Sequence, residues 1–311
     1  MASYDPDLSK IEVLDLEFGS LPTIASFLIP STDGPVLVES GPASTLGALE
    51  AALAARGMAL GDVRNVLLTH IHLDHAGAAW KLAENGATVW VHPVGAPHLA
   101  DPSKLLASAT AIYGDAMDSL WGPVKPIPAG RLRTVDHGEV IRIGGLSFEA
   151  LHTPGHARHH IAYRFGDAVF TGDVGGVRMP TGPVVPPCPP PDIDLEAWRA
   201  SLAILREVGP GVLYLTHFGP FTDVPGHLDR LEDSLERFAA WVRVRLREGL
   251  DENSMLPLFE AYTRGFVDSA APGERELECY ALANPAFMSV WGLVRYWRKH
   301  GEPPAETRQS A

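Results

Sequence analysis

Three histidines and one aspartate lie within six residues, in the segment His70-Ile71-His72-Leu73-Asp74-His75. Imidazole nitrogens and carboxylate oxygens are ligands that zinc, manganese and iron ions all accept. His70 and His72 alternate along the chain, so both side chains can point the same way while the backbone is extended. Asp74 and His75 follow where the chain turns into a helix. This spacing predicts a site for one or two metal ions.

Three more polar residues stand at the ends of predicted strands: His156 in Thr-Pro-Gly-His, Asp173 in Thr-Gly-Asp, and His217 in Thr-His-Phe-Gly. Loops that leave strand ends are where ligands from distant parts of a chain converge. The resulting donor set contains nitrogen and oxygen but no thiolate. Such a set suits an open catalytic pair of metals better than a closed structural zinc site.

The order of these motifs over roughly residues 11 to 222 resembles the metallo-β-lactamase-fold hydrolase superfamily, and most of all its glyoxalase II-like and lactonase-like branches. The resemblance implies an α/β fold, a four-layer αβ/βα sandwich with the metals at one edge. It also implies a division of the ligands, with His70, His72 and His156 on the first metal, Asp74, His75 and His217 on the second, and Asp173 bridging them.

One motif departs from the family pattern. Many members have Asp-x-Gly after an early strand, whereas this chain has Glu39-Ser40-Gly41. A side chain at this place supports the metal loop through hydrogen bonds. Either Glu39 or Ser40 could take that role, and the sequence leaves the choice open.

The charges of the expected site favour hydrolysis. Two divalent ions bring four positive charges, of which Asp74, Asp173 and a metal-bridging hydroxide remove three. The remaining positive charge would stabilise an oxyanion, and water bridging two metals loses its proton near neutral pH. We therefore expect the hydroxide to be the nucleophile and, by the resemblance, Asp74 to shuttle a proton. Zn²⁺ is the first expectation, and Mn²⁺ or Fe would also suit these ligands.

The surrounding pattern alternates short apolar runs with helical stretches. Strands are predicted at residues 24–29, 36–38 and 63–68, followed by a helix at 75–85. Five short runs between residues 132 and 173 indicate strands joined as antiparallel hairpins. The proline-rich segment 176–192 must be a loop, and it should border the site because it follows Asp173.

Four side chains near these motifs are candidates for substrate contact. Tyr113 and Trp121 lie in a predicted helical insertion at residues 101–128, where they could line the mouth of the site or simply pack over the sheet. Arg178 could pair with a substrate carboxylate or phosphate, or remain a solvated loop arginine. His160 follows His156 closely and could face the metal cavity.

Beyond Pro225 only helical periodicity remains. We expect a catalytic domain at residues 1–225 and a helical region at 226–311 that covers one end of the sandwich or pairs subunits. Trp291 and Trp297 lie on roughly one face of its last helix. This aromatic face could form a contact between subunits, so a homodimer is possible.

The 311 residues carry 38 acidic and 25 basic side chains, a formal net charge of −13. An anionic surface disfavours nucleic acid and anionic lipid as partners. No apolar run reaches the roughly 18 residues of a membrane span, and no secretory signal is evident. With only two cysteines, we expect a reducing, cytoplasmic compartment. The family resemblance, together with the complete ligand set and the acidic surface, implies a hydrolase of a small ester, thioester or lactone. The alternative is a mononuclear iron enzyme resembling persulfide dioxygenases.

Overall fold

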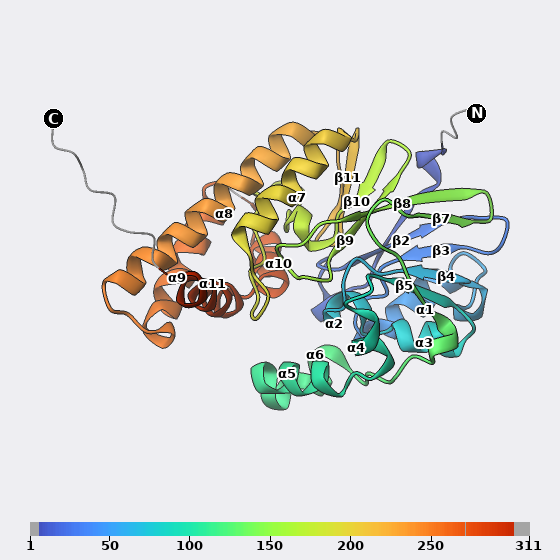
Figure 1. Ribbon diagram of the computed structural model, residues 1–311, viewed down its shortest axis with the longest axis horizontal. Helices are drawn as coiled ribbons and strands as arrows, with labels where there is room; N and C mark the ends of the chain where they lie inside the picture. The colour runs from blue at the N-terminus through green and yellow to red at the C-terminus, as the bar shows by residue number, and fades with distance from the viewer. Residues whose placement is uncertain (1–5, 271, 302–311) are drawn as a thin grey trace.

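The computed structural model describes residues 6–270 and 272–301. Two six-stranded sheets face each other, and helices cover their outer faces (Figure 1). The first sheet has the order β1 (Glu12–Asp15), β2 (Ala25–Ile29), β3 (Val36–Val38), β4 (Asn65–Leu67), β5 (Thr88–Val91) and β6 (Leu132–Thr134). The second has the order β12 (Gly219–Phe221), β11 (Val212–Leu215), β10 (Ala168–Phe170), β9 (Ile161–Phe165), β8 (Leu146–His152) and β7 (Val140–Ile143).

Parallel pairing in the middle of each sheet brings several strand ends to one edge. Strands β3 to β6 run parallel to one another, as do β10 and β11. Every residue of β3 and β10 is buried, which fits continuous apolar runs covered on both faces. The loops after β3, β4, β10 and β11 supply the polar side chains described below.

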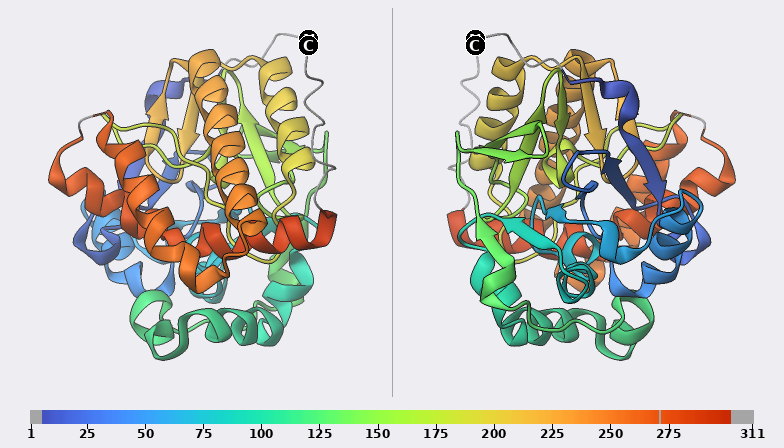
Figure 2. Two further views of the ribbon diagram at one scale, coloured as in Figure 1. Left: turned by 90° about the vertical axis from the view of Figure 1, so that its left-hand side faces the viewer. Right: turned by 90° about the vertical axis from the view of Figure 1, so that its right-hand side faces the viewer.

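The helices form two groups. Those nearer the first sheet are α1 (Leu46–Ala54), α2 (Leu73–Ala76), α3 (Ala79–Glu84) and α4 (Ala96–Ala100), with the insertion α5 (Ser103–Tyr113) and α6 (Met117–Trp121) at the lower edge of Figures 1 and 2. The second group is α7 (Leu195–Val208), α8 (Val224–Arg247), α9 (Glu252–Asp268), α10 (Glu274–Ala283) and α11 (Ala286–His300). None of the described helices is long and apolar enough to cross a membrane.

Three hydrophobic clusters hold these layers together. One lies between the sheets and contains Phe27, Phe148 and Tyr163, and a second lies under the helices of the first sheet. The third joins Trp198 of α7 to α8 and then to Phe259 of α9 without interruption. The C-terminal helices therefore share a core with the second sheet, and the division of the chain at residue 225 stays a prediction.

The structure agrees with most predicted elements and corrects two. β6 was expected in the antiparallel hairpins, but it pairs parallel to β5 in the first sheet. The helix expected at 75–85 is two helices, α2 and α3, and α2 begins earlier, at Leu73. Gly77 marks the break, where an added Cβ would lie 2.4 Å from the carbonyl oxygen of Leu73 and 3.0 Å from Pro42 Cα. Segment 176–192 is a loop with one isolated bridge, between Val177 and Val185, and both cysteines are free and buried.

Candidate metal centre

The seven candidate ligands come together at one edge of the sandwich. The histidine segment follows β4 of the first sheet, whereas His156, Asp173 and His217 follow β8, β10 and β11 of the second. Their ligand atoms form two groups, each within 4.8 Å: His70, His72 and His156 in the first, and Asp74, His75, Asp173 and His217 in the second. The chain thus brings together the residues that the sequence singled out.

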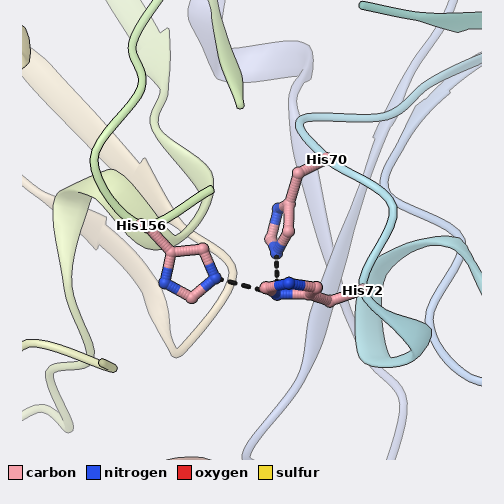
Figure 3. Close-up of side chains that lie close together, drawn as sticks. All are labelled: His70, His72 and His156. Atoms are coloured by element: carbon pink, nitrogen blue, oxygen red, sulfur yellow. Dashed lines mark hydrogen bonds between the residues drawn. The ribbon is translucent and has the colours of Figure 1, made fainter. Parts of the chain in front are cut away.

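Three imidazole nitrogens converge in the first group (Figure 3). His72 Nδ1 lies 3.0 Å from His70 Nε2 and 2.9 Å from His156 Nε2. His156 Nδ1 donates a hydrogen bond to the carbonyl oxygen of Pro187 at 2.9 Å, so its Nε2 presents a lone pair. Ligand nitrogens about 2.0–2.1 Å from a tetrahedral ion would be roughly 3.3 Å apart. The arrangement fits a cation bound by three nitrogens.

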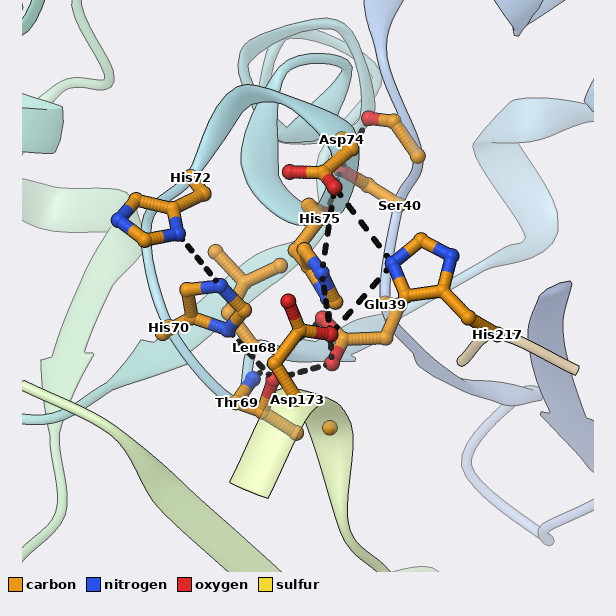
Figure 4. Close-up of polar contacts among 12 residues, drawn as sticks. Glu39, Ser40, Leu68, Thr69, His70, His72, Asp74, His75, Asp173 and His217 are labelled. Atoms are coloured by element: carbon orange, nitrogen blue, oxygen red, sulfur yellow. Dashed lines mark hydrogen bonds and ion pairs between the residues drawn. The ribbon is translucent and has the colours of Figure 1, made fainter. Parts of the chain in front are cut away.

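The second group combines two carboxylates with two imidazoles (Figure 4). His75 Nε2 lies 3.2 Å from Asp173 Oδ1 and 3.6 Å from Asp74 Oδ2, and His217 Nε2 lies 3.4 and 3.5 Å from the same oxygens. Three of these atoms, His75 Nε2, His217 Nε2 and Asp173 Oδ1, are buried without a hydrogen-bond partner among the described residues. Buried polar atoms are rarely left so, and a divalent cation would satisfy all three.

Asp173 lies between the two groups. Its Oδ1 faces the second group, and its Oδ2 is 3.4 Å from His156 Nε2 in the first. This is the geometry that a bridging carboxylate needs. The role of Asp173 predicted from the family resemblance is therefore compatible with its placement.

The protonation of the two groups differs. Burial and the neighbouring histidines hold the pKa of His70 well below its usual range, and the pKa of His72 is lowered to about 4. Against the effect of burial, the charges of Asp173, Asp74 and Glu39 raise the pKa of His75 well above its usual range. The first group thus offers neutral imidazoles, whereas the carboxylates of the second attract positive charge.

Glu39 and Ser40 support the same ligand in different ways. The buried carboxylate of Glu39 lies 3.2 Å from His75 Nδ1 and accepts hydrogen bonds from the amide and the hydroxyl of Thr69. The Thr69 hydroxyl is in turn 3.0 Å from His70 Nδ1. Ser40 instead donates to the backbone oxygen of His75 at 2.8 Å. Glu39 therefore takes the side-chain role that the sequence left open.

Two further ligand histidines, His217 and His156, are held by backbone carbonyl groups that the sequence analysis did not identify. His217 Nδ1 is 2.6 Å from the oxygen of Thr23, and His156 Nδ1 is paired with Pro187. Every residue has a backbone carbonyl group, so the residue type does not indicate which one accepts a hydrogen bond from a ligand histidine. His227 also has a structural contact: its Nε2 lies 2.8 Å from the oxygen of Gly175, in the turn after Asp173.

His160 lies beneath the centre. Its Nδ1 is 3.0 Å from the hydroxyl of Thr153, and its Nε2 accepts a hydrogen bond from the amide of Val174 at 3.3 Å. Both ring nitrogens therefore have protein partners, and the side chain is fully buried. His159, next to it, has its ring centroid 5.8 Å from that of His72, and its Nδ1 has no hydrogen-bond partner among the described residues.

Tyr113 approaches the centre from the insertion. Burial, together with the charge of Asp74, raises the pKa of Tyr113, which places the phenol within the field of a candidate ligand. Its ring packs edge-on against Trp121 at 5.1 Å and against Phe287 of α11 at 6.3 Å. Trp121 is buried and stacks on Phe18. The charge of Asp74 thus acts on the Tyr113 phenol, whereas Trp121 packs against the ring of Tyr113 and supports it.

Arg178 has partners within the protein. Its guanidinium donates to Asp223 at 2.7 Å and lies over the ring of Phe221, 4.2 Å from the centroid. Its backbone amide donates to the oxygen of His217 at 2.6 Å. The structure therefore places the Arg178 side chain in an ion pair beside the site.

A basic cavity of about 540 Å³ lies farther along α11. It is lined by Pro190, Glu252, Trp291, Arg295, Arg298 and Lys299. Arg298 is paired with Glu252 at 2.5 Å. On a chain with a net charge of −13, this is a local concentration of positive charge.

Comparisons with known proteins agree with this geometry. The family model of the metallo-beta-lactamase superfamily matches residues 22–217. A metallo-beta-lactamase fold-containing protein of Sulfurisphaera tokodaii is 33% identical over 50% of this chain and 60% of its own length. An atrochrysone carboxyl ACP thioesterase of Aspergillus fumigatus is 28% identical over 54% of this chain and 31% of its own length. The chain thus spans less than two thirds of each of these relatives.

Two further similarities cover more of the chain. A hydroxyacylglutathione hydrolase of Xylella fastidiosa is 24% identical over 76% of this chain and 79% of its own length. The structure of a metallo-beta-lactamase family protein of Thermus thermophilus aligns with a TM-score of 0.66 and 23% identity, over 96% of this chain and 97% of that one. The sandwich fold and the expected family are confirmed. The chain belongs to the metallo-beta-lactamase superfamily.

Proposed function

We propose that this protein is a dinuclear metal-dependent hydrolase of a small ester, thioester or lactone. The observation that carries the proposal is the double cluster of seven donors with Asp173 between its two halves. Zn²⁺ is the proposed metal, since nitrogen and oxygen donors in this number suit it, and Mn²⁺ or Fe would also bind. Relatives named as an acyl carrier protein thioesterase and a hydroxyacylglutathione hydrolase support an acyl substrate.

Two divalent ions in this site would polarise the substrate carbonyl and acidify water. The protein contributes orientation and proton transfer. Asp74 is the ligand carboxylate whose side chain reaches solvent, at 20% exposure. Burial opposes its ionisation, but the charge of His75 and the close approach of His217 lower the pKa of Asp74 to about 2. Asp74 is therefore ionised at neutral pH, as a metal ligand must be, and its partial exposure is what supports the proposed role in relaying a proton.

Other side chains would shape the substrate site. The phenol of Tyr113 stays protonated, so it can donate a hydrogen bond near Asp74. The cavity lined by Arg295, Arg298 and Lys299 could hold an anionic part of the substrate, away from the acyl group. We propose that Trp121 supports Tyr113, against which it packs, and that the backbone amide of Arg178 helps to hold His217 in place.

The completeness of the second group favours this reading over the mononuclear iron alternative. A single-iron centre would need only three protein ligands, whereas here Asp74, His75 and His217 present further donors, two of them without protein partners. Elemental analysis of the protein purified without added metal separates the two functions. About two zinc or manganese ions per chain support the hydrolase, and about one iron, with oxygen uptake on a persulfide, supports the alternative.

The activity test uses metal-replete protein and a panel of small esters, thioesters and lactones. We expect turnover of at least one class that is lost in a His70→Ala, Asp173→Ala double variant. The matched control is His137→Ala, Asp229→Ala, which alters exposed residues of the same types outside the site. If the catalytic double variant and the unchanged protein hydrolyse every compound equally, the proposal is wrong.

A further inference from the structure

The loop at residues 176–192 carries the group that orients one metal ligand. The carbonyl oxygen of Pro187 accepts the hydrogen bond from His156 Nδ1. This contact selects the tautomer of His156 that presents Nε2 to His70 and His72. The position of the Pro187 carbonyl therefore bears on the geometry of the whole first group.

The turn between α10 and α11 holds that loop on both sides of Pro187. Asn284 Nδ2 donates to the oxygen of Pro186 at 3.2 Å, and the amide of Cys188 donates to Ser289 Oγ at 3.4 Å. Ser289 Oγ in turn donates to Asn284 Oδ1 at 3.1 Å. The two side chains form one connected clamp around the residue that fixes His156.

The Ser289 side of the clamp is buried and closely packed, whereas Asn284 is half-buried. Ser289 is 1% exposed and Cys188 is fully buried. At Gly292, one turn along α11, an added Cβ would lie 2.0 Å from the Cys188 oxygen, so helix and loop touch through their backbones. A cavity of about 620 Å³ borders the clamp on its other side, lined among others by Asn284 and Ser289.

Three other ligand histidines, His217, His75 and His70, are oriented by residues in the loops of the first sheet. His217 is paired with Thr23, His75 with Glu39, and His70 with Thr69. These partners follow or precede strands of the first sheet. Among these four histidines, His156 is the one whose partner is held by the C-terminal helices.

We propose that Asn284 and Ser289 are positioning residues for the first metal, acting through Pro187 and His156. They do not touch the metal ligands themselves. Loss of a residue that orients a metal-bound histidine lowers metal affinity about 10- to 100-fold. The effect should fall on the first group, because no described contact links the clamp to Asp74, His75 or His217. The inference concerns metal binding, so it stands or falls independently of the proposed substrate.

The test is cobalt binding to the full-length variants Asn284→Ala and Ser289→Ala. Titration of metal-free protein with Co²⁺, followed by visible absorption and by competition with a chelator, resolves the equivalents bound. We expect one equivalent to bind about 10-fold or more weakly with an altered absorption spectrum, and the other to change less than about threefold. Ser289→Thr keeps the hydroxyl and should restore tight binding.

Two comparisons keep the result interpretable. Asn253→Ala and Ser269→Ala change exposed residues of the same types in the helical region and should bind cobalt as the unchanged protein does. Asn284→Asp keeps the acceptor for Ser289 but replaces the donor to Pro186 by a carboxylate oxygen, which repels that carbonyl group, and it serves if either alanine variant does not fold. Unchanged affinity and spectrum in Asn284→Asp and Ser289→Ala, or an equal loss of both equivalents, would overturn the proposal.

Discussion

Replacing Glu39 by glutamine should weaken both halves of the metal centre. The Glu39 carboxylate is buried, contacts His75 Nδ1 directly, and reaches His70 through the hydroxyl of Thr69. Glutamine has nearly the same shape, but one of its two terminal atoms is an NH₂ group that cannot accept a hydrogen bond. Both hydrogen bonds that the Glu39 carboxylate accepts come from Thr69, one to each oxygen, so glutamine must lose one of them. The negative charge that faces His75 Nδ1 is lost as well.

The size of the effect follows from those contacts. A hydrogen bond to a charged group contributes about 1.5–3 kcal/mol, and each 1.4 kcal/mol is about a tenfold change in an equilibrium constant. We therefore expect Glu39→Gln to lower metal affinity about 10- to 100-fold. Unlike the loss expected for Asn284→Ala, this one should affect both equivalents, because the carboxylate supports one ligand of each group.

The assay is competition between the protein and a chromophoric chelator for Zn²⁺ at pH 7.5, with elemental analysis of the retained metal. Glu236→Gln is the control, because that carboxylate forms an exposed ion pair with Arg199. Its zinc affinity should equal that of the unchanged protein. Retention of two zinc ions by Glu39→Gln with unchanged affinity would refute the assigned role of Glu39.

Three further substitutions have defined outcomes. Arg178→Ala should lower thermal stability and leave KM nearly unchanged, because the side chain is paired with Asp223; a large rise in KM would instead show substrate contact. Burial lowers the pKa of His227 to about 4 from 6.5, so its contribution to stability is full above pH 6.5 and is lost as pH falls toward 4. Between pH 8 and pH 5 the unchanged protein should lose about 2 kcal/mol more unfolding free energy than His227→Asn, and equal losses would contradict this. Gly155→Ala should lower the free energy of unfolding in urea by about 2–4 kcal/mol, because φ is +135° and the new Cβ would lie 2.4 Å from the Trp198 backbone. An unchanged unfolding midpoint would contradict this and show that the loop relaxes freely.

The metal ligands could be predicted from the sequence because only a few residue types bind metal ions. Imidazoles at positions 70, 72 and 75 with a carboxylate at 74 form a combination that is uncommon outside metal sites. The strand ends that carry His156 and Asp173 also follow from short apolar runs. Local patterns of this kind needed no knowledge of how the two sheets meet.

The partners of the ligands were not predictable to the same degree. Choosing between Glu39 and Ser40 depends on backbone direction at one residue, and Glu39 has φ +65°, which turns its side chain inward. The carbonyl groups of Thr23 and Pro187 carry no residue signature at all. The predicted pairing of β6 was wrong for a related reason. A strand of only three residues carries too little pattern to determine which sheet it joins.

Each half of the centre is completed by the other sheet. His70 and His72 belong to the loop after β4, but the first group also needs His156 from beyond β8. Asp74 and His75 likewise meet Asp173 and His217 from the second sheet. Metal ions held between the sheets would favour only the docked arrangement, since a ligand stabilises the state that binds it. Through the proposed clamp at Asn284 and Ser289, this dependence would extend to the last helices.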